Sequence, residues 1–452
     1  MIFALPIEIK SREYLSKLYL AYHILKYTKH QVIIGKKSEI YSIYKNSKNI
    51  FLISKSGPKK KFNFKEETIK NNFFSILDEE GPLINLRFKD FKNRCSKKVL
   101  SKCNYYFTWG DDDKRLLKKN LKIKSNILNF GHPKFDLINN KNTTFFSKEI
   151  YLKKKYKNYV FFPSNFHQDQ IMDNKDYLVW RSKQAINDKN FIKRSSNILK
   201  KDLKNYINTI DLIKKLAADN PKINFIFRPH PRQDIKKVKK RFGKFKNNIY
   251  IEKKFPITPY INKCLLYMHR GCTSAFEALK LKKKIVYLKN YNYNQKEWMY
   301  KIGYNLIKKK NDHKIISDVI NGKIKIKKNK YSSIIKNIGS KKFCKSFVEF
   351  FNDDKFKNVN SSINFNFVKI KKPFTDNIKS KFKNLLIKNN LIKKIIVMFN
   401  EDLILPKTYG FSKFDNLSMG EVFRDLNKFF VNNKKFHIKK INHNSYLLKK
   451  YK

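Results

Sequence analysis

The chain has 452 residues, of which 41% are hydrophobic and 31% charged, and its formal net charge is +66 at pH 7. This hydrophobic content excludes a chain that is disordered throughout, and the length allows about three average domains. Five cysteines without a CxxC pair are typical of a reducing compartment, and no apolar run approaches the ~20 residues that a membrane-spanning helix needs.

The positive charge comes mostly from lysine and is spread along the whole chain. An excess of this size usually indicates a nucleic-acid-binding protein. Here Lys, Asn, Ile, Phe and Tyr are all enriched while Gly, Pro and Ala are scarce, which is the coding bias of an AT-rich genome. We therefore expect solvated lysine side chains and no specific nucleic-acid partner, with peripheral contact to an anionic membrane as a secondary effect.

Strand-like and helix-like segments alternate from the start of the chain to residue 130, and this alternation predicts a parallel sheet covered by helices. Residues 2–9 predict the first strand, and Ser11 is placed to cap the helix that follows it. Glu8 and Arg12 lie where this strand ends. Because doubly wound folds bind ligands beyond the carboxyl ends of their strands, these two residues are candidates for binding the acceptor substrate of a transfer reaction. Further strands are predicted at residues 31–34, 50–53, 73–77 and 105–109.

After Gly131-His132-Pro133 the alternation breaks, residues 139–158 are polar and rich in lysine, and we expect His132 to pack at a hinge. Alternation resumes with strands predicted at residues 159–162, 223–227, 249–251, 264–268 and 285–288 and helices at residues 206–218 and 273–281. Beyond residue 339 the regularity is lost, although residues 377–399 form a basic amphipathic stretch that either packs on the body or lies on anionic lipid.

These patterns predict an α/β protein with two Rossmann-like domains that face each other across a cleft, the architecture called GT-B. The first domain is expected at residues 1–138 and the second at residues 159–338. A basic C-terminal extension is expected at residues 339–452.

Two polar segments of the second half each follow a predicted strand: Arg228-Pro229-His230-Pro231 and, further on, Gly271-Cys272-Thr273-Ser274. A guanidinium binds a phosphate at two points, an imidazole holds an oxyanion, and a helix N-terminus offers unpaired N–H groups. Each segment alone is more typical of a surface arginine, a hydrogen-bonded histidine or an ordinary helix cap. Their order after two strands predicts instead a pocket for a phosphate-bearing donor.

Three further residues extend this predicted pocket. Arg270 belongs to it because arginine is rare in this lysine-rich chain, and only the planar guanidinium makes a two-point contact with phosphate. Ser164 and Asn165 follow the strand at residues 159–162, where a doubly wound fold binds ligands, although a simple turn is the alternative.

Sugar transfer also needs a group that takes the proton of the acceptor hydroxyl, and the first half offers Asp78, Glu79 and Glu80. In an extended stretch Asp78 and Glu80 share one side while Glu79 points to the other, and a solvated acidic turn is the alternative. The aspartates at residues 111–113 are typical of the first turn of a helix, so we expect no metal site and no cofactor. Domain closure would join an acceptor-binding first domain to a second domain that binds the nucleotide-sugar.

Five segments, in this order, resemble the bacterial surface carbohydrate biosynthesis proteins. They are residues 5–8 (LPIE) with 11–13 (SRE), 78–82 (DEEGP), 131–136 (GHPKFD), 228–231 (RPHP) and 269–278 (HRGCTSAFEA), and the match spans residues 1–300.

More distantly, an acidic pair before glycine, then His-Pro, then a Ser/Thr pair resembles the pattern of bacterial sialyltransferases and Kdo transferases, which use CMP-sugars. The resemblance implies that Glu79 assists the acceptor hydroxyl and that His230, with Thr273 and Ser274, contacts the donor phosphate. It also implies that Glu277 holds ribose hydroxyls as in GT-B enzymes, with a first-turn acid stabilised by the helix dipole as the alternative. The residues at 282 and 284 are lysines where those enzymes usually have Gly and Pro.

We therefore expect a glycosyltransferase that moves an acidic sugar of Kdo or nonulosonate type from a CMP-linked donor to a surface polysaccharide or lipid-linked glycan. A UDP- or GDP-hexose donor is an alternative. CDP-glycerol glycerophosphotransferases have a similar Arg-x-His-Pro segment, so a glycerol or ribitol phosphate transferase is the nearest enzymatic rival, and a non-catalytic basic binder of nucleic acid or glycan is the other. Because no signal peptide precedes the first strand, the expected location is the cytoplasm, at the inner face of the membrane.

Overall fold

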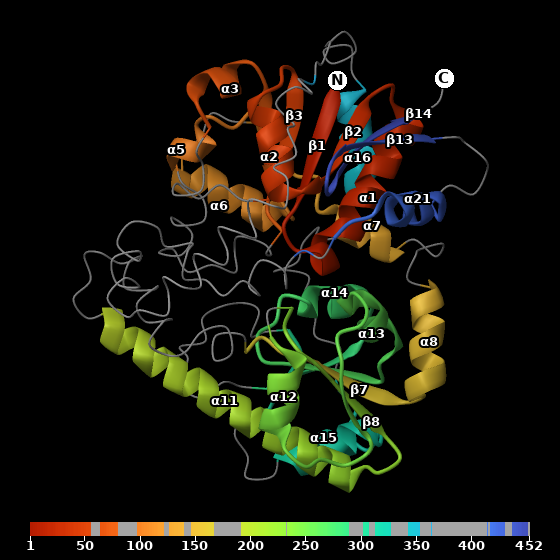
Figure 1. Cartoon of the computed structure of the whole chain (residues 1–452). Helices are drawn as coiled ribbons and strands as arrows, with labels where there is room; N and C mark the ends of the chain where they lie inside the picture. Colours follow the sequence, from red (N-terminus) through yellow and green to blue (C-terminus); the bar gives the residue numbers. More distant parts are fainter. Residues whose placement is uncertain are drawn as a thin grey trace, which may run out of the picture.

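The computed structural model describes residues 1–55, 64–79, 97–121, 126–139, 146–166, 191–231, 233–288, 302–306, 312–326, 342–352, 363, 414, 416–429 and 436–450. These residues form two α/β halves, each built on its own sheet, which are the upper and lower bodies of Figure 1. The predicted class of an α/β protein with two Rossmann-like halves is therefore confirmed.

The first sheet has eight strands in the order β13-β14-β2-β1-β3-β4-β5-β6. Its parallel strands are β1 (Ile2–Ile7), β2 (Gln31–Lys36), β3 (Ile50–Ser54), β4 (Phe73–Leu77), β5 (Tyr105–Phe107) and β6 (Asn126–Leu128). β1 is buried along its whole length, which agrees with its unbroken apolar sequence, because both faces of a parallel sheet are covered. The register pairs Ile2 with Gln31 on one side and with Ile50 on the other.

The helices of this half are α1 (Lys10–Tyr27), α2 (Lys37–Lys45), α3 (Glu66–Lys70), α5 (Lys97–Leu100), α6 (Asp111–Leu121) and α7 (Pro133–Asn139). The three aspartates at residues 111–113 begin α6, as predicted. The prediction that Ser11 caps α1 is wrong, because the helix begins at Lys10 with Ile9 as its N-cap residue. The N–H groups of Arg12 and Glu13 already donate to the carbonyl oxygen of Ile9, at 3.1 and 2.9 Å.

The C-terminal segment completes the first half instead of standing apart from it. It contributes α16 (Phe343–Phe351), α21 (Met419–Asn427) and the antiparallel strands β13 (Phe436–Asn442) and β14 (Ser445–Lys450). β14 pairs with β2 so closely that a Cβ atom at Gly35 would lie 2.3 Å from the carbonyl oxygen of Asn444. Only glycine fits this position, because such a contact is far shorter than any real Cβ contact.

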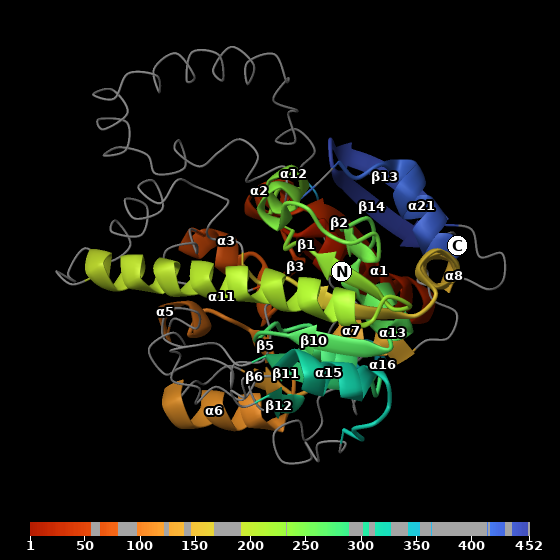
Figure 2. The same ribbon diagram turned by 90° about the horizontal axis from the view of Figure 1, so that it is seen from below.

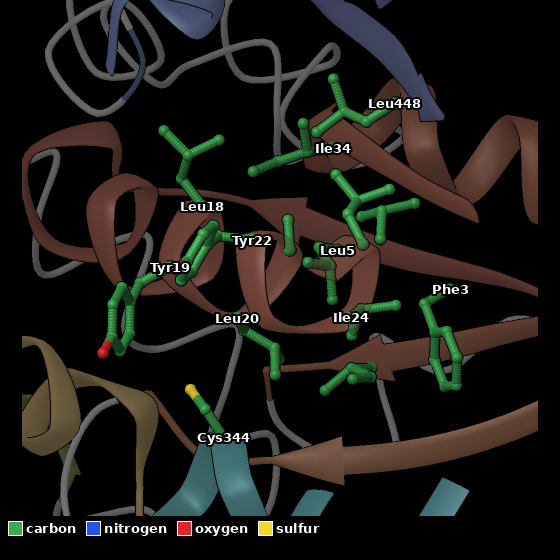
Figure 3. Packing of buried hydrophobic residues seen from close by; sticks show 14 of the residues in the cluster. Phe3, Leu5, Leu18, Tyr19, Leu20, Tyr22, Ile24, Ile34, Cys344 and Leu448 are labelled. Carbon is green, nitrogen blue, oxygen red and sulfur yellow. The ribbon is translucent and has the colours of Figure 1, made fainter. Parts of the chain in front are cut away.

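The core of the first half lies between β1, α1 and α16. The ring of Phe3 contacts those of Phe347 and Phe351 of α16, each at a centroid distance of 5.3 Å. Figure 3 shows Phe3, Leu5 and Ile24 in this core, with Cys344 of α16 at its lower edge. The apolar face of β1 is thus covered by a helix that is more than 300 residues away in the sequence. The basic stretch predicted at residues 377–399 lies outside the described residues.

The second sheet has six parallel strands in the order β12-β11-β10-β7-β8-β9. They are β7 (Tyr159–Pro163), β8 (Asn224–Arg228), β9 (Ile249–Ile251), β10 (Leu266–His269), β11 (Lys284–Leu288) and β12 (Tyr304–Leu306). The helices of this half are α8 (Phe146–Tyr156), α11 (Phe191–Asp219), α12 (Ile235–Phe242), α13 (Ile257–Lys263), α14 (Ala275–Lys280) and α15 (Asp312–Ile320). Figure 2, a view from below, shows α11 crossing this half along its length.

The two halves meet through an apolar cluster and a narrow crevice. Trp109 and Phe135 of the first half belong to the same buried cluster as Phe276 of α14, and the Trp109 and Phe276 rings lie 6.2 Å apart. Beside them is a crevice of about 30 Å³ between α1, α7, α13 and α14. Among the helices that the structure describes, none is both long and apolar enough to cross a bilayer.

Candidate functional site

The order of the second sheet defines where a ligand would bind. The chain builds outward from β7 through β8 and β9 on one side and from β10 through β12 on the other. β7 and β10 are therefore the neighbours at which the strand order reverses, and ligands of doubly wound folds bind beyond the carboxyl ends of such strands. The predicted residues Ser164 and Asn165 follow β7, and the Asn165 side chain donates a hydrogen bond of 2.8 Å to the carbonyl oxygen of Arg270, which follows β10.

Arg228 is the last residue of β8 and is only 6% exposed. Its Nη2 donates to the carbonyl oxygen of Phe255 at 3.1 Å, whereas its Nε has no hydrogen-bond partner. No carboxylate of the described residues lies within ion-pair distance of this guanidinium, and Glu277 and Glu252 act on it only from further away. Burial lowers the pKa of Arg228. A buried cation without a counter-ion is costly, and a bound anion would offset that cost.

The loop that follows β10 is held by a neutral histidine. The Nδ1 of His269 accepts the N–H of Gly271 at 3.1 Å, and its Nε2 therefore donates to the carbonyl oxygen of Ile302 at 2.8 Å. Burial lowers the pKa of His269 to about 4, which keeps the ring uncharged. Gly271 has a φ of 83°, a value that favours glycine, so the chain turns sharply at this point.

Two of the next three residues present main-chain N–H groups without acceptors. No oxygen in the described part of the structure accepts the N–H of Cys272 or of Thr273, whereas the N–H of Ser274 interacts with the Cys272 sulfur. The N–H groups of Ala275 and Phe276 are already used, because they donate to the carbonyl oxygens of residues 272 and 273. The prediction that the helix begins at Thr273 is corrected, since α14 begins at Ala275, and the unpaired N–H groups belong to the loop. Successive loop N–H groups of this kind form an anion-binding concavity.

The side chains of this loop divide into two groups. The buried Ser274 hydroxyl contacts the Tyr267 hydroxyl at 2.7 Å and the Cys272 sulfur at 2.9 Å, so it holds the loop from inside. The Thr273 side chain is half-buried, and its hydroxyl makes no hydrogen bond to the described residues. Arg270 is turned away, because its Nε donates to the Thr209 hydroxyl of α11 at 2.6 Å. Of these predicted donor-binding side chains, Thr273 is therefore the one placed to meet a ligand.

His230 is half-buried in a short, rigid loop beyond Arg228. Its N–H donates to the Gln233 side chain at 2.8 Å, and the N–H of Gln233 donates back to the His230 carbonyl oxygen at the same distance. Lys253 clamps the loop through a 2.7 Å bond to the carbonyl oxygen of Gln233. The two polar segments lie near each other, since Arg228 and Cys272 interact electrostatically.

Glu277 is buried and already engaged. Its Oε2 accepts the Thr258 hydroxyl at 2.7 Å, and its Oε1 lies 3.2 Å from the Nζ of Lys134. Lys134 belongs to α7 of the first half, so this ion pair joins the two halves beside the crevice. The carboxylate that the resemblance assigns to ribose binding thus has an interdomain partner in this arrangement.

At the carboxyl edge of the first sheet, the strand order reverses between β1 and β3. Glu8 follows β1, and its Oε2 lies 3.0 Å from the Nζ atoms of both Lys37 and Lys55. The Nη2 of Arg12 lies 2.8 Å from the Oε1 of Glu13. The predicted acceptor-binding residues Glu8 and Arg12 are therefore half-buried members of ion pairs at this edge.

Glu79 follows β4 at the same edge, and its side chain is fully buried. Its Oε1 lies 3.3 Å from the Nζ of Lys17, and its Oε2 lies 3.3 Å from the Nε2 of His132. Burial favours the neutral acid, but the Lys17 ammonium and His132 outweigh it and lower the pKa of Glu79. Neither Glu79 oxygen nor the His132 Nε2 makes a hydrogen bond of good geometry, which is rare for fully buried polar atoms.

His132 is neutral in this arrangement. Its Nδ1 accepts the N–H of Lys134 at 3.2 Å, which leaves the proton on Nε2, facing Glu79. Burial lowers its pKa more than Glu79 raises it. Its ring also packs on Trp109 of the same half at a centroid distance of 4.6 Å, and the hinge position stays a prediction. With both imidazole nitrogens occupied in this way, Glu79 is the proton acceptor of the pair.

The other two predicted carboxylates contribute less to this picture. Asp78 is buried, and its carbonyl oxygen accepts the indole N–H of Trp109 at 2.6 Å. Glu80 lies outside the described residues. Within the described residues no group of His, Cys, Asp and Glu is arranged to hold a metal ion.

Sequence reasoning missed the buried cations at both edges. Lys17 is one lysine in a chain that is rich in them, and its position on α1 carried no signal before the sheet was known. Lys134 stands in the segment GHPKFD, so its place in that motif was a usable signal. The roles assigned to the individual site residues stay predictions.

No protein-family description and no curated protein matches the chain. Similar solved structures include S. aureus MnaA in a co-structure with UDP. The two sequences are 10% identical, the alignment covers 77% of this chain and 94% of that chain, and the TM-score is 0.44. A variant of the wall teichoic acid polymerase TagF is 13% identical. The alignment covers 78% of this chain and 86% of that chain, and the TM-score is 0.47. The Methanocaldococcus jannaschii UDP-GlcNAc 2-epimerase, in complex with UDP-GlcNAc and UDP, is 12% identical. The alignment covers 78% of this chain and 99% of that chain, and the TM-score is 0.45.

Proposed function

We propose that this chain is a glycosyltransferase that binds a nucleotide-linked donor at the carboxyl edge of the second sheet. The observation that carries the proposal is Arg228, a buried guanidinium that lacks a counter-ion among the described residues and lies near a loop in which the N–H groups of Cys272 and Thr273 have no acceptor among those residues. Fixed donors and a buried positive charge at one place stabilise an anion far better than they do in water. A phosphate fits this site because it takes a two-point contact from a guanidinium and further bonds from the loop.

The donor phosphate would meet four groups. Arg228 supplies the charge, the N–H groups of Cys272 and Thr273 donate to the oxygens, and the Thr273 hydroxyl adds one more donor. His230 lies on the rigid loop beyond Arg228 and would hydrogen-bond the same phosphate. In the reaction the acceptor oxygen attacks the anomeric carbon and the bond from that carbon to the phosphate oxygen breaks. The leaving phosphate keeps the electron pair, and this growing charge faces Arg228.

The acceptor proton would pass to Glu79. Its lowered pKa keeps the carboxylate ionised at neutral pH, and its partners Lys17 and His132 fix its direction. Because Glu79 is fully buried, an acceptor reaches it only after a rearrangement, and the proposed one is separation of the halves, which breaks the Lys134–Glu277 ion pair beside the crevice. Opening and closing of the two halves is therefore part of the proposed cycle.

For the donor we propose a CMP-linked acidic sugar and for the acceptor a surface polysaccharide or lipid-linked glycan. The resemblance of the motifs at Glu79, His230 and residues 273–274 to CMP-sugar enzymes supports this finer assignment. A CDP-alcohol would use the same anion site, but the bond that breaks would be phosphorus to oxygen, and phosphate would enter the product.

The test compares binding and product. Calorimetry with CMP, CDP, UDP and GDP should show binding of at least one nucleotide, with CMP or CDP the tightest. A CMP-linked nonulosonate should then release CMP in an acceptor-dependent reaction, and product without phosphorus separates sugar transfer from polyol phosphate transfer. Binding of DNA that is unchanged in an Arg228→Met chain, with no nucleotide binding at all, would overturn the proposal in favour of a basic binding protein.

Occupancy of the site can be read from one thiol. Cys272 is half-buried, whereas the other described cysteines, Cys103, Cys264 and Cys344, are buried. In a Cys95→Ser background, nucleotide should slow alkylation of Cys272 without changing the other three. Protection of a buried thiol, or none at Cys272, would place the nucleotide elsewhere.

A further inference from the structure

A second hollow lies in the first half, on the side of α1 that faces α7 and α16. Its volume is about 630 Å³, which falls in the range of small-molecule and oligosaccharide sites. Its walls include Tyr19, His23 and Tyr27 of α1, Asp136 of α7, and Lys345 and Glu349 of α16. None of these residues takes part in the proposed donor site.

One wall of this cavity is a row of rings. Tyr19, His23 and Tyr27 are four residues apart, so they share one face of α1. The ring centroids lie 4.7 Å apart for Tyr19 and His23 and 5.6 Å apart for His23 and Tyr27. Figure 3 shows the Tyr19 ring at the margin of the core with its hydroxyl turned away from the labelled apolar residues. Tyr27 is 50% exposed, so the row opens to solvent at its far end.

Tyr19 and His23 meet edge to face at an interplanar angle of 72°, and His23 and Tyr27 are tilted by 34°, so the exposed Tyr27 ring offers a stacking face and His23 offers a polar edge. The buried Nε2 of His23 has no hydrogen-bond partner among the described residues, and burial lowers the pKa of this ring to about 4, so it is uncharged at neutral pH. The C–H groups on one face of a sugar ring carry partial positive charge and pack on the electron-rich face of an aromatic ring. The sugar hydroxyls then need donors and acceptors at the side.

The opposite wall supplies those groups with both signs of charge. Asp136 and Glu349 are acceptors and Lys345 is a donor, and the Lys345 Nζ lies 3.6 Å from the Glu349 Oε1. With Lys342 included, two lysines and two acids line the cavity, so its charges balance and do not favour a polyanion such as a nucleotide. An exposed aromatic face beside mixed polar side chains fits a polyhydroxylated ligand instead.

The cavity and the crevice lie along the same face of α1. Arg12, Leu15 and Ser16 line the crevice, and Tyr19, His23 and Tyr27 continue the same face at spacings of three and four residues. From Arg12 to Tyr27 the helix rises roughly 22 Å. α7 borders both spaces, with Lys134 at the crevice and Asp136 at the cavity.

We propose that the cavity between α1, α7 and α16 binds a glycan chain, and that it holds the growing acceptor a few sugars behind the end that enters the crevice. That the bound glycan is the acceptor being extended rests on the proposed function, whereas the binding of a glycan is inferred from the cavity alone. The site keeps a long acceptor attached while successive donors bind and leave.

The experiment uses the full chain and two tetrasaccharides, neutral chitotetraose and acidic hyaluronan tetrasaccharide, with binding followed by saturation-transfer NMR and calorimetry. At least one probe should bind, and Tyr27→Ala and His23→Ala should each weaken it about tenfold, the effect of losing one aromatic contact. Tyr27→Phe should keep the affinity because it keeps the ring. The matched control is Tyr151→Ala, which removes another exposed tyrosine on α8 of the other half.

Two results would overturn the glycan site: neither tetrasaccharide binds, or both bind as well to Tyr27→Ala and His23→Ala as to the unchanged chain. Nucleotide binding is measured in parallel and should be the same in all four variants. If no nucleotide binds while the glycan does and responds to Tyr27→Ala, the proposed function fails and the glycan site stands. If nucleotide binds and the glycan does not, the reverse holds.

Discussion

The carboxyl edges of the two sheets differ in whether their buried charged side chains have partners of opposite charge. At the first edge, Glu79 is buried against Lys17 and His132, so negative and positive groups compensate one another. At the second edge, Arg228 is also buried but has no carboxylate within ion-pair distance among the described residues, and the N–H groups of Cys272 and Thr273 nearby have no acceptor there. The charges of the first edge compensate one another, whereas at the second edge the proposed donor phosphate would supply the missing negative charge.

Because of this difference, we expect substitutions at the first edge to lower the stability of the fold and substitutions at the second edge to lower ligand affinity. Removing one member of a compensated buried pair strands its partner and costs stability. Removing an uncompensated buried charge costs little stability, because the charge itself was a burden in the folded state. The following variants use this contrast.

The largest expected effect is that of Lys17→Met. It leaves Glu79 and Glu13 buried without their common ammonium group, which lies 3.3 Å from the former and 3.5 Å from the latter. We expect the free energy of unfolding in urea to fall by about 3 kcal/mol. Adding Glu79→Gln to this variant should restore part of the loss, and the exposed Lys29→Met serves as the control with little change. Equal losses in both lysine variants would show that the first edge is not a compensated network.

Arg228→Met should separate binding from stability. Nucleotide affinity is expected to fall about a hundredfold, which is about 2.7 kcal/mol, because the variant removes the buried guanidinium that has no carboxylate within ion-pair distance among the described residues. The free energy of unfolding should change by less than about 1 kcal/mol, the value of the single hydrogen bond to Phe255. Calorimetry and thermal unfolding measure the two quantities, with the exposed Arg241→Met as the control. Retained affinity would remove the basis of the donor site.

A smaller effect concerns Asp136, whose pKa burial raises from 3.8 to about 6, although it accepts the N–H of Cys344 at 2.7 Å. The folded state binds this proton more tightly than the unfolded state does, so the carboxyl adds stability below pH 4 and loses it as the pH rises through 6. Asp136→Asn keeps an acceptor without the charge. We expect it to match the unchanged chain at pH 4 and to be more stable by about 1 to 2 kcal/mol at pH 7. The measurement is the free energy of unfolding in urea at several pH values. If its pH dependence were the same for Asp136→Asn and the unchanged chain, the prediction would be contradicted.

The smallest expected effect is that of Lys134→Gln, which removes the ion pair between the halves. Stability should fall by only about 1 kcal/mol, because the buried Glu277 keeps its hydrogen bond from the Thr258 hydroxyl. Hydrogen exchange in residues 275–280 should nevertheless quicken, because α14 loses its contact with α7. The control is Lys263→Gln, which removes the Lys263–Glu149 pair inside the second half. Exchange that quickens equally in both would mean that Lys134 does not couple the halves.

Much of the site could be predicted because it follows strand ends. Arg228 ends β8, and residues 269–271 follow β10, so a pattern of strands with polar termini is enough to bring them to one edge of a parallel sheet. The finer division of roles could not be predicted. Ser274 turns inward to Tyr267 and Arg270 turns to α11 because side-chain direction depends on neighbours that are distant in the sequence.

The sequence by itself determined the alternation of strands and helices, and therefore two parallel sheets, because local apolar patterns and turn residues act over a few positions. Only the tertiary structure decided that the C-terminal strand β14 joins β2 and that α16 covers β1, because these contacts join residues separated by hundreds of positions. The same holds for Lys17, which forms an ion pair with Glu79 because α1 packs against the edge of the first sheet. Burial and charge compensation are properties of the packed chain, and no local pattern encodes them.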